Sequence, residues 1–290
     1  MDYAELMKPE LTFLSVLTAL CGFYLGSIDH LNIWLFLHTA FGTGLLGGGL
    51  GALNQYIERG YDGMMRRTER RPLPAGRLLP LEVLIFGIAL TTTGLIELTF
   101  FTNYLAGYLA FLTFVSYIFF YTPLKRVTSL STIIGGIPGA LPPMIGWAAA
   151  RGSLHMEAWA LFAILFCWQM PHFLALAWMY RRDYARAGYK MLTVVDPTGK
   201  RSNKHILFFT LALVPASIVT TLLGLTGIFY LIGAVVLGLG FLYFGIVLNV
   251  YTNENTSEPS ARINVLSRRL FFASLIYLPL LMILMSADKV

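Results

Sequence analysis

Nine apolar stretches, each close to the length of a membrane-spanning helix, constrain this chain more than any other feature. They occupy approximately residues 11–28, 32–53, 80–101, 103–122, 131–150, 157–180, 206–227, 229–250 and 268–286. A helix needs about 20 apolar residues to cross the hydrocarbon core of a bilayer. Hydrophobic residues make up 57% of the sequence and charged residues only 12%. A soluble domain is nearer a quarter charged. We therefore predict an all-α, polytopic membrane helix bundle, with nine transmembrane helices around a central cavity and residues 1–290 in a single domain.

The basic residues are distributed unevenly between the two sides of this bundle. If the N-terminus is cytoplasmic, all of the 21 lysines and arginines except Arg151 and Lys289 lie in cytoplasmic segments. The positive-inside rule then places the N-terminus in the cytoplasm and the C-terminus outside. We expect a multi-pass protein of the cell (cytoplasmic) membrane that contacts the lipid bilayer. Because the basic residues lie in loops between spans, the net charge of +6 does not indicate nucleic-acid binding.

One segment, residues 54–77, begins where the second apolar stretch meets water. Its sequence is NQYIERGYDGMMRRTERRPLPAGR, and it places Asn54, Glu58 and Asp62 at intervals of four. Residues four apart on a helix lie near one another, with about 40° of drift per step. Two carboxylates and an amide oxygen form a set of hard oxygen ligands that suits Mg²⁺. We interpret the three side chains as candidate metal ligands and catalytic residues.

The same segment contains six arginines. Arginine binds phosphate oxygens through forked hydrogen bonds, so Arg66, Arg67 and Arg71 are candidate substrate ligands. Carboxylates and arginines together at a membrane mouth indicate a metal-bridged diphosphate on a lipid-soluble substrate. Basic residues at a membrane edge also simply mark the cytoplasmic side. That alternative explains the arginines but does not explain the regular spacing of the acidic residues.

A second polar segment follows the sixth apolar stretch. Asp183 lies there among several basic residues and could supply a further magnesium ligand opposite Glu58 and Asp62. Arg182 and Tyr184 beside it are candidate substrate ligands. The alternative for Asp183 is a local ion pair with a neighbouring arginine.

Two further features belong to the fourth and fifth apolar stretches. Lys125 and Arg126, at the inner end of the fourth, could hold a diphosphate leaving group or could only mark topology. The fifth stretch, STIIGGIPGALPPMIGW, is rich in glycine and proline. Proline kinks helices and glycine permits close approach, so we expect a kinked, tightly packed helix that can wall a pocket.

His172 is an ionisable residue within the sixth stretch. Such residues default to a functional hypothesis, although an imidazole can also simply hydrogen-bond a neighbouring helix. It could ligate iron or hydrogen-bond a carboxylate. Trp168, Phe173 and Trp178 lie close by in the sequence and could face a flat aromatic ligand, or they could belong to an interfacial aromatic belt.

Three segments carry a family resemblance: NQYIERGYDGMMRRTERRPLPAG, YTPLKRVTSLSTIIGGIPGALPPMIGW and WQMPHFLALAWMYRRDYARAGYKML. With them the chain resembles the protoheme IX farnesyltransferases (heme O synthases), a branch of the UbiA-type intramembrane prenyltransferases. The superfamily pattern Asn-Asp-x-x-Asp-x-x-x-Asp is matched by Asn54, Glu58 and Asp62, with Gln55 at its second position. The second aspartate motif is reduced to Asp183. The segment Trp-Gln-x-Pro-His-Phe marks the heme branch.

The resemblance implies an enzyme that uses Mg²⁺ as cofactor and farnesyl diphosphate as donor, bound between the two long inner loops. The acceptor would be a vinyl group of heme b, and the products heme O and pyrophosphate. Heme A synthase or a terminal oxidase assembly is the implied partner. Two alternatives stay open: prenylation of an aromatic acid or quinone precursor, and a heme or lipid carrier without catalysis.

Overall fold

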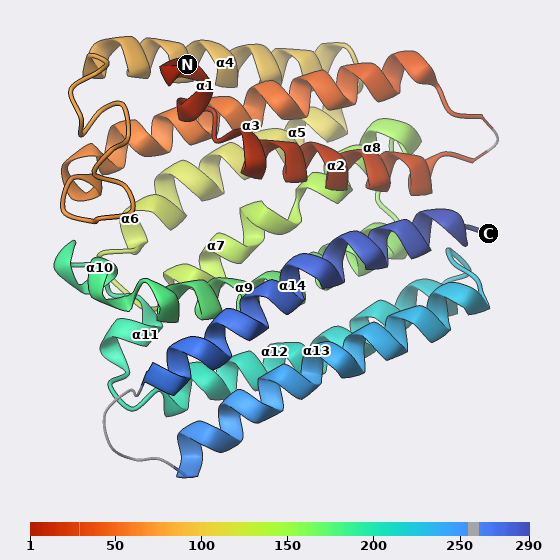
Figure 1. Ribbon diagram of the computed structural model, residues 1–290. Coiled ribbons are helices and arrows are strands. Elements are labelled where there is room, and N and C mark those ends of the chain that lie inside the picture. Colours follow the sequence, from red (N-terminus) through yellow and green to blue (C-terminus); the bar gives the residue numbers. More distant parts are fainter. Residues whose placement is uncertain (29, 255–260) are drawn as a thin grey trace.

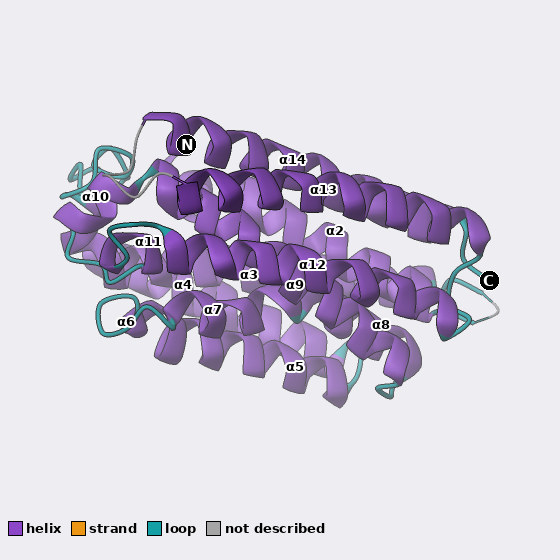
Figure 2. Ribbon diagram, turned by 90° about the horizontal axis from the view of Figure 1, so that it is seen from below, coloured by secondary structure: helices purple, strands orange, loops and turns teal. Residues whose placement is uncertain are grey.

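The computed structural model describes residues 1–28, 30–254 and 261–290, and these are almost wholly helical (Figures 1 and 2). Among them the only β-type pairing is a bridge between Thr226 and Lys289. The elements are, in order, α1 Asp2–Leu6, α2 Pro9–Gly26, α3 Ile33–Asp62, α4 Pro80–Phe100, α5 Tyr104–Val115, the π-helix η1 Ser116–Tyr121, α6 Thr122–Leu124, α7 Ser131–Ala140, α8 Pro142–Arg151, α9 Met156–Met179, α10 Arg181–Arg186, α11 Leu192–Val195, α12 Lys200–Leu222, α13 Ile228–Glu254 and α14 Ala261–Ala287.

Within the described residues, nine helical segments are long and apolar enough to cross a membrane, which confirms the predicted number. Two spans are composite. One joins α5, η1 and α6, and the other joins α7 and α8. Asn32 begins α3 as an N-cap, since its side chain accepts a hydrogen bond of 3.2 Å from the Leu35 amide. The helix then continues past the predicted end of the span at residue 53, so the polar motif is helical down to Asp62.

The predicted kink of the fifth span is confirmed, because the helix breaks at Leu141 between α7 and α8. Pro142 and Pro143 follow directly, and neither has an amide proton to continue the hydrogen-bond ladder. The segment 251–267 is polar and lacks apolar periodicity, which predicts a linker, but α13 and α14 extend into it from both ends. Residues 255–260 of that linker lie outside the described part of the chain.

Glycine lets α2 and α8 pack with their backbones in contact. A Cβ atom at Gly22 would lie 2.1 Å from the carbonyl oxygen of Pro143, and one at Gly146 would lie 1.7 Å from that of Ala19. Neither neighbour can move aside, because both are backbone atoms. Small residues allow this close approach between membrane helices, and it fixes α8 as an inner wall of the bundle.

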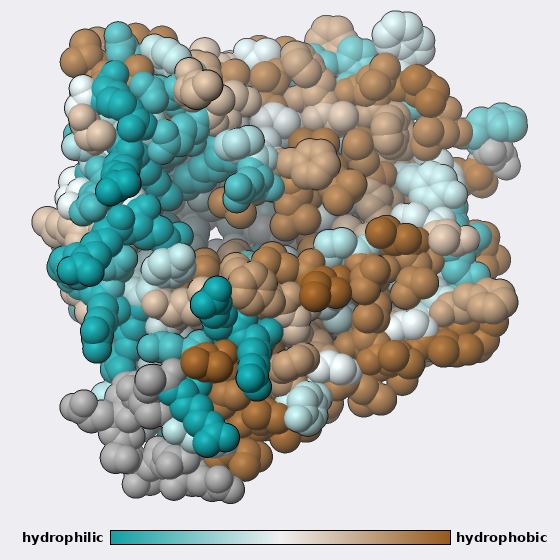
Figure 3. Space-filling model, in the orientation of Figure 1, coloured by the Kyte–Doolittle hydropathy of each residue, from teal (hydrophilic) through white to brown (hydrophobic). Residues whose placement is uncertain are grey.

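The hydrophilic surface gathers at one end of the molecule, over the α10–α11 region and the loops around it (Figures 1 and 3). Hydrophobic surface covers most of the remaining length. Figure 3 also shows a hollow on this face, between α2 on one side and α9 and α14 on the other, where the hydrophilic end meets the hydrophobic part. The N-terminal helix α1 lies toward the hydrophilic end, and the C-terminus lies at the opposite end.

The basic asymmetry predicts that this hydrophilic end is cytoplasmic. In a variant whose cysteines at positions 21 and 167 are replaced, we expect a membrane-impermeant thiol reagent added outside intact cells to miss Glu69→Cys and Lys204→Cys. It should label His155→Cys, which is exposed at the other end between α8 and α9. Labelling of both inner positions with protection of His155→Cys would reverse the orientation.

Candidate active site

The last turns of α3 place three oxygen-bearing side chains on one face at the hydrophilic end of the bundle. Asn54, Glu58 and Asp62 are 1%, 6% and 1% exposed. All three lie within one unbroken helix, so the interval of four brings them into a single row, as the sequence spacing predicted. Burying two carboxylates is costly unless each is paired with a cation, and each of these is.

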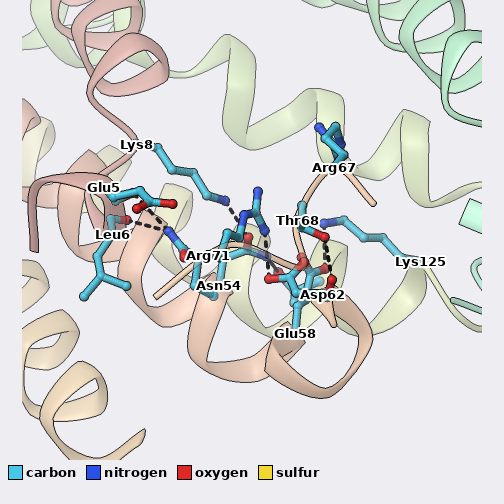
Figure 4. Close-up of polar contacts among 12 residues, drawn as sticks. Glu5, Leu6, Lys8, Asn54, Glu58, Asp62, Arg67, Thr68, Arg71 and Lys125 are labelled. Carbon is cyan, nitrogen blue, oxygen red and sulfur yellow. Dashed lines mark hydrogen bonds and ion pairs between the residues drawn. The ribbon is translucent and has the colours of Figure 1, made fainter. Parts of the chain in front are cut away.

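Three cations reach this row, one for each oxygen-bearing side chain (Figure 4). The Lys8 ammonium donates to Asn54 Oδ1 over 2.6 Å. Lys125 Nζ lies 2.7 Å from Glu58 Oε1, and Arg71 donates to Asp62 Oδ2 over 2.8 Å. We call these six side chains the mouth cluster: Lys8, Asn54, Glu58, Asp62, Arg71 and Lys125.

Asp62 has the oxygen atom best placed for a metal ion. Its Oδ2 binds Arg71, and its backbone carbonyl accepts a hydrogen bond of 2.8 Å from the Thr68 hydroxyl. Its Oδ1 is fully buried and has no hydrogen-bond partner. An unpartnered carboxylate oxygen beside Glu58 and the Asn54 amide makes a hard-oxygen donor set that fits Mg²⁺.

Lys125 follows α6 directly and is fixed through its backbone as well as its side chain. Its carbonyl accepts a hydrogen bond of 2.8 Å from the Lys190 amide, which joins the connection after α6 to the segment after α10. Burial alone would lower the pKa of its ammonium, but the Glu58 carboxylate, with Tyr121 and Tyr117, outweighs this, and the pKa lies well above its ordinary value. Lys125 is therefore a permanent cation in the mouth cluster.

Lys8 enters the mouth cluster from the turn between α1 and α2. Its φ of 49° and ψ of 65° lie in the left-handed region, which costs a non-glycine residue about 1–2 kcal/mol. This turn aims the side chain at Asn54. Burial of the ammonium, reinforced by the nearby Arg71 guanidinium, lowers the pKa of Lys8 to about 7.

Helix α1 is fastened at the same place. Arg77 pairs with Asp2 at 3.1 Å and with Glu5 at 2.7 Å. The Gln55 amide donates to the carbonyl oxygens of Glu5 and Leu6, each over 3.2 Å. The N-terminal segment is thereby attached to both ends of the 54–77 segment.

Basic and aromatic side chains surround the mouth cluster. Arg126 hydrogen-bonds the Tyr61 hydroxyl and lies over its ring, with 4.2 Å between the guanidinium carbon and the ring centroid. Arg67 donates to the Tyr184 hydroxyl over 3.3 Å and lies 4.9 Å from the Tyr180 ring centroid. These contacts bring the segments after α3, α6 and α9 together around one mouth.

The other predicted site residues lie outside the mouth cluster. Asp183 forms an ion pair of 3.6 Å with Arg186, one turn further along α10. Throughout the described residues, no three His, Cys, Asp or Glu side chains gather as a metal site. Asp183 as a second metal ligand therefore stays a prediction. Arg66 and Arg182 are exposed to solvent.

His172 and Trp168 lie on α9 and face α14. His172 Nδ1 is 2.8 Å from Ser274 Oγ, and the imidazole stacks between Trp168 and Phe271, with centroid distances of 5.0 Å and 4.7 Å. Trp168 Nε1 donates to the Ser274 carbonyl oxygen over 2.9 Å. Sequence reasoning did not identify Ser274 and Phe271, because nothing in the sequence shows which helix faces α9.

Gln169, which lies between Trp168 and His172 in the sequence, connects α9 to the broken span formed by α7 and α8. Its side-chain amide donates to the Gly136 carbonyl oxygen over 2.6 Å. A Cβ atom at Gly139 would lie only 2.2 Å from Gln169 Oε1, so the glutamine fills the space beside the kink. The Trp-Gln-x-Pro-His-Phe segment therefore connects α9 to α14 and α7 through its polar side chains.

The sequence of this helical bundle matches a known protein family. The model of the UbiA prenyltransferase family matches residues 15–276. The chain belongs to this family. It is 44% identical to the protoheme IX farnesyltransferase of Solibacter usitatus, over 99% of this chain and 98% of that relative. The protein is accordingly a membrane-embedded prenyltransferase.

Solved structures show the same fold. A digeranylgeranylglyceryl phosphate synthase structure matches with a TM-score of 0.81 at 17% identity, and the match covers 99% of this chain and 97% of that one. A UbiA homologue from Archaeoglobus fulgidus, bound to DMAPP and Mg²⁺, matches with a TM-score of 0.68 at 14% identity and covers 99% of both chains. At these identities the likeness establishes the helical architecture alone.

Proposed function

We propose that the protein transfers a farnesyl group from farnesyl diphosphate to a vinyl group of heme b, giving heme O and pyrophosphate. The observation that carries the proposal is the mouth cluster, in which a cation lies within 2.8 Å of each of three oxygen-bearing side chains. A site that contains both anionic metal ligands and phosphate-binding cations suits a metal diphosphate. The choice of farnesyl and heme comes from the name of the 44% identical relative.

The donor's diphosphate would bind at the hydrophilic end, with Mg²⁺ held by Asn54, Glu58 and Asp62. Support for Mg²⁺ comes from the unpartnered Asp62 Oδ1 and from the Archaeoglobus fulgidus homologue bound to it. When bound, the ion supplies electrostatic stabilisation of the departing pyrophosphate. Lys125 and Arg71 lie where they would pass from the carboxylates to the phosphate oxygens.

The farnesyl chain would extend from the mouth cluster into the apolar interior of the bundle. Loss of pyrophosphate leaves an allylic cation, which the vinyl group of heme attacks. Addition of water to the resulting cation gives the hydroxyethylfarnesyl group, so heme b, farnesyl diphosphate and water are consumed. The apolar walls serve to keep water from the first cation until the vinyl group has reacted.

The hydrogen bonds of His172 support a role for this residue in binding the acceptor, heme b. Ser274 Oγ donates its single proton to the Phe271 carbonyl oxygen over 2.5 Å. His172 Nδ1 must then carry the proton in its own bond to Ser274 Oγ. This tautomer leaves a lone pair on Nε2, the form that ligates iron or accepts a hydrogen bond from a protonated heme propionate.

The deciding experiment is incubation of the purified protein with farnesyl diphosphate, Mg²⁺ and heme b, followed by mass spectrometry of the hemes and assay of released pyrophosphate. We expect heme O and pyrophosphate in equal amounts. If pyrophosphate is released only when a phenolic or quinone-precursor acceptor is supplied, that compound and not heme b is the acceptor. If no pyrophosphate is released with either acceptor, prenyl transfer is refuted.

We propose that the reaction takes place in the cell membrane and supplies heme A synthase or a terminal oxidase assembly.

We expect His172→Ala to weaken heme binding and to lower heme O formation by at least about tenfold, equivalent to roughly 1.4 kcal/mol. Its affinity for farnesyl diphosphate should barely change, because His172 is bonded to α14 and not to the mouth cluster. Heme titration by absorbance and a diphosphate-binding assay on the same variant measure the two effects separately, with His205→Ala as the control histidine.

If His172 only joins two helices, the expected loss is about 0.6 kcal/mol of stability, the typical strength of such a bond in a membrane protein. Heme affinity and turnover equal to those of the wild type would then assign it to helix packing.

A further inference from the structure

The mouth cluster contains three basic side chains but two carboxylates. Lys125 pairs with the Glu58 carboxylate and Arg71 with the Asp62 carboxylate. The third basic side chain, Lys8, donates to the neutral amide oxygen of Asn54 and forms no ion pair among the described residues. A buried charge requires compensation, and an amide oxygen offers a hydrogen bond without an opposite charge. Lys8 is therefore the basic side chain of the mouth cluster that has no carboxylate partner.

The backbone holds Lys8 in this place at a conformational cost. Among the described residues it is the only non-glycine residue with positive φ. The segment around it is fixed from two sides, by the ion pairs of Arg77 with Asp2 and Glu5 and by the hydrogen bonds of Gln55 to the α1 carbonyl oxygens. Strained backbone persists where the surrounding structure imposes it, which is typical of functional sites.

We propose that Lys8 is a diphosphate-binding residue that exchanges Asn54 for a phosphate oxygen when the donor binds. This assignment rests on the proposed function and adds a residue to its donor site. The exchange has two consequences. The ammonium gains an anionic partner, and the Asn54 amide oxygen is released to the metal ion that enters with the diphosphate. An ammonium has three protons to donate, so the flexible lysine stem can follow the phosphate without movement of α1.

The test measures binding to the purified full-length protein by titration calorimetry, with inorganic pyrophosphate and farnesyl diphosphate in the presence of Mg²⁺ and with Mg²⁺ alone. The variant is Lys8→Met. The matched control is Lys204→Met, which removes an exposed lysine from the same end of the bundle. We expect Lys8→Met to bind both diphosphates at least about tenfold more weakly, or roughly 1.4 kcal/mol. Its affinity for Mg²⁺ alone should not fall, because the competing ammonium has left Asn54.

Wild-type affinity of Lys8→Met for both diphosphates overturns the assignment. So does an equal loss of affinity for Mg²⁺ alone and for pyrophosphate, because Lys8 would then maintain the shape of the site. Heme O analysis of the wild type separates this assignment from the proposed function. If diphosphate binding depends on Lys8 but no heme O forms, heme b is refuted as the acceptor and the assignment of Lys8 is retained. If the wild type binds no diphosphate, both the proposed function and the assignment of Lys8 are overturned.

Discussion

Asp62→Ala is expected to abolish nearly all turnover while the protein still folds and inserts into the membrane. Asp62 carries the unpartnered buried oxygen and anchors Arg71. Its loss therefore removes a proposed metal ligand and frees a cation from its position. Removal of one preorganised electrostatic group at a reacting centre typically lowers the rate by about a hundredfold to a thousandfold. The measurement is heme O formation per folded protein, with chelation of Mg²⁺ expected to give the same loss.

Folding of this variant is expected because the change opens no apolar cavity. The Thr68 hydroxyl bonds the backbone carbonyl of residue 62, which alanine retains, and the freed Arg71 side chain is 21% exposed to solvent. The matched control is Glu69→Ala, which removes an exposed acid from the same segment and should leave turnover unchanged. Asp183→Ala tests the second predicted ligand in the same assay. Wild-type rates for Asp62→Ala would exclude it as an essential ligand.

The local part of this site could be predicted from sequence because helix geometry determines it. Asn54, Glu58 and Asp62 share a face through their spacing alone, and the structure differs only in extending α3 over them. The break at Leu141 was likewise predictable, since the prolines that follow it remove backbone donors whatever surrounds them. The nine spans follow from apolar length, which the thickness of the bilayer sets.

The long-range part could not be predicted. Arg66, Arg67 and Arg71 look equivalent in sequence, but only Arg71 reaches a carboxylate, while Arg67 turns to the tyrosines of another segment and Arg66 faces solvent. From the sequence, Lys8 is only one of the basic residues that mark the cytoplasmic side. Its role depends on a left-handed turn and on a contact with Asn54 across 46 positions of the chain. Tertiary packing decides such pairings, and no local pattern encodes them.

Lys125→Met is expected to destabilise the protein as well as inactivate it. The Glu58 side chain is 8% exposed, and this variant leaves its carboxylate without the cation 2.7 Å away. Removing one partner of a buried ion pair costs about 3–5 kcal/mol, because the other charge stays buried and uncompensated. We expect about 3 kcal/mol, the lower end of that range, because Lys8 still attracts the Glu58 charge. Thermal unfolding in detergent measures the loss against Lys204→Met.

The double variant Lys125→Met with Glu58→Gln separates stability from chemistry. Neutralising Glu58 removes the uncompensated charge, so the unfolding midpoint should return most of the way to that of the wild type, since a neutral buried pair is often no less stable than an ionic one. Heme O formation should stay as low as in Lys125→Met, because the double variant lacks both a proposed metal ligand and a proposed phosphate-binding cation. A double variant as unstable as Lys125→Met would show that Lys125 stabilises the fold through its contact with Tyr121 or its aliphatic stem. Recovered turnover would remove the Lys125–Glu58 pair from the catalytic site.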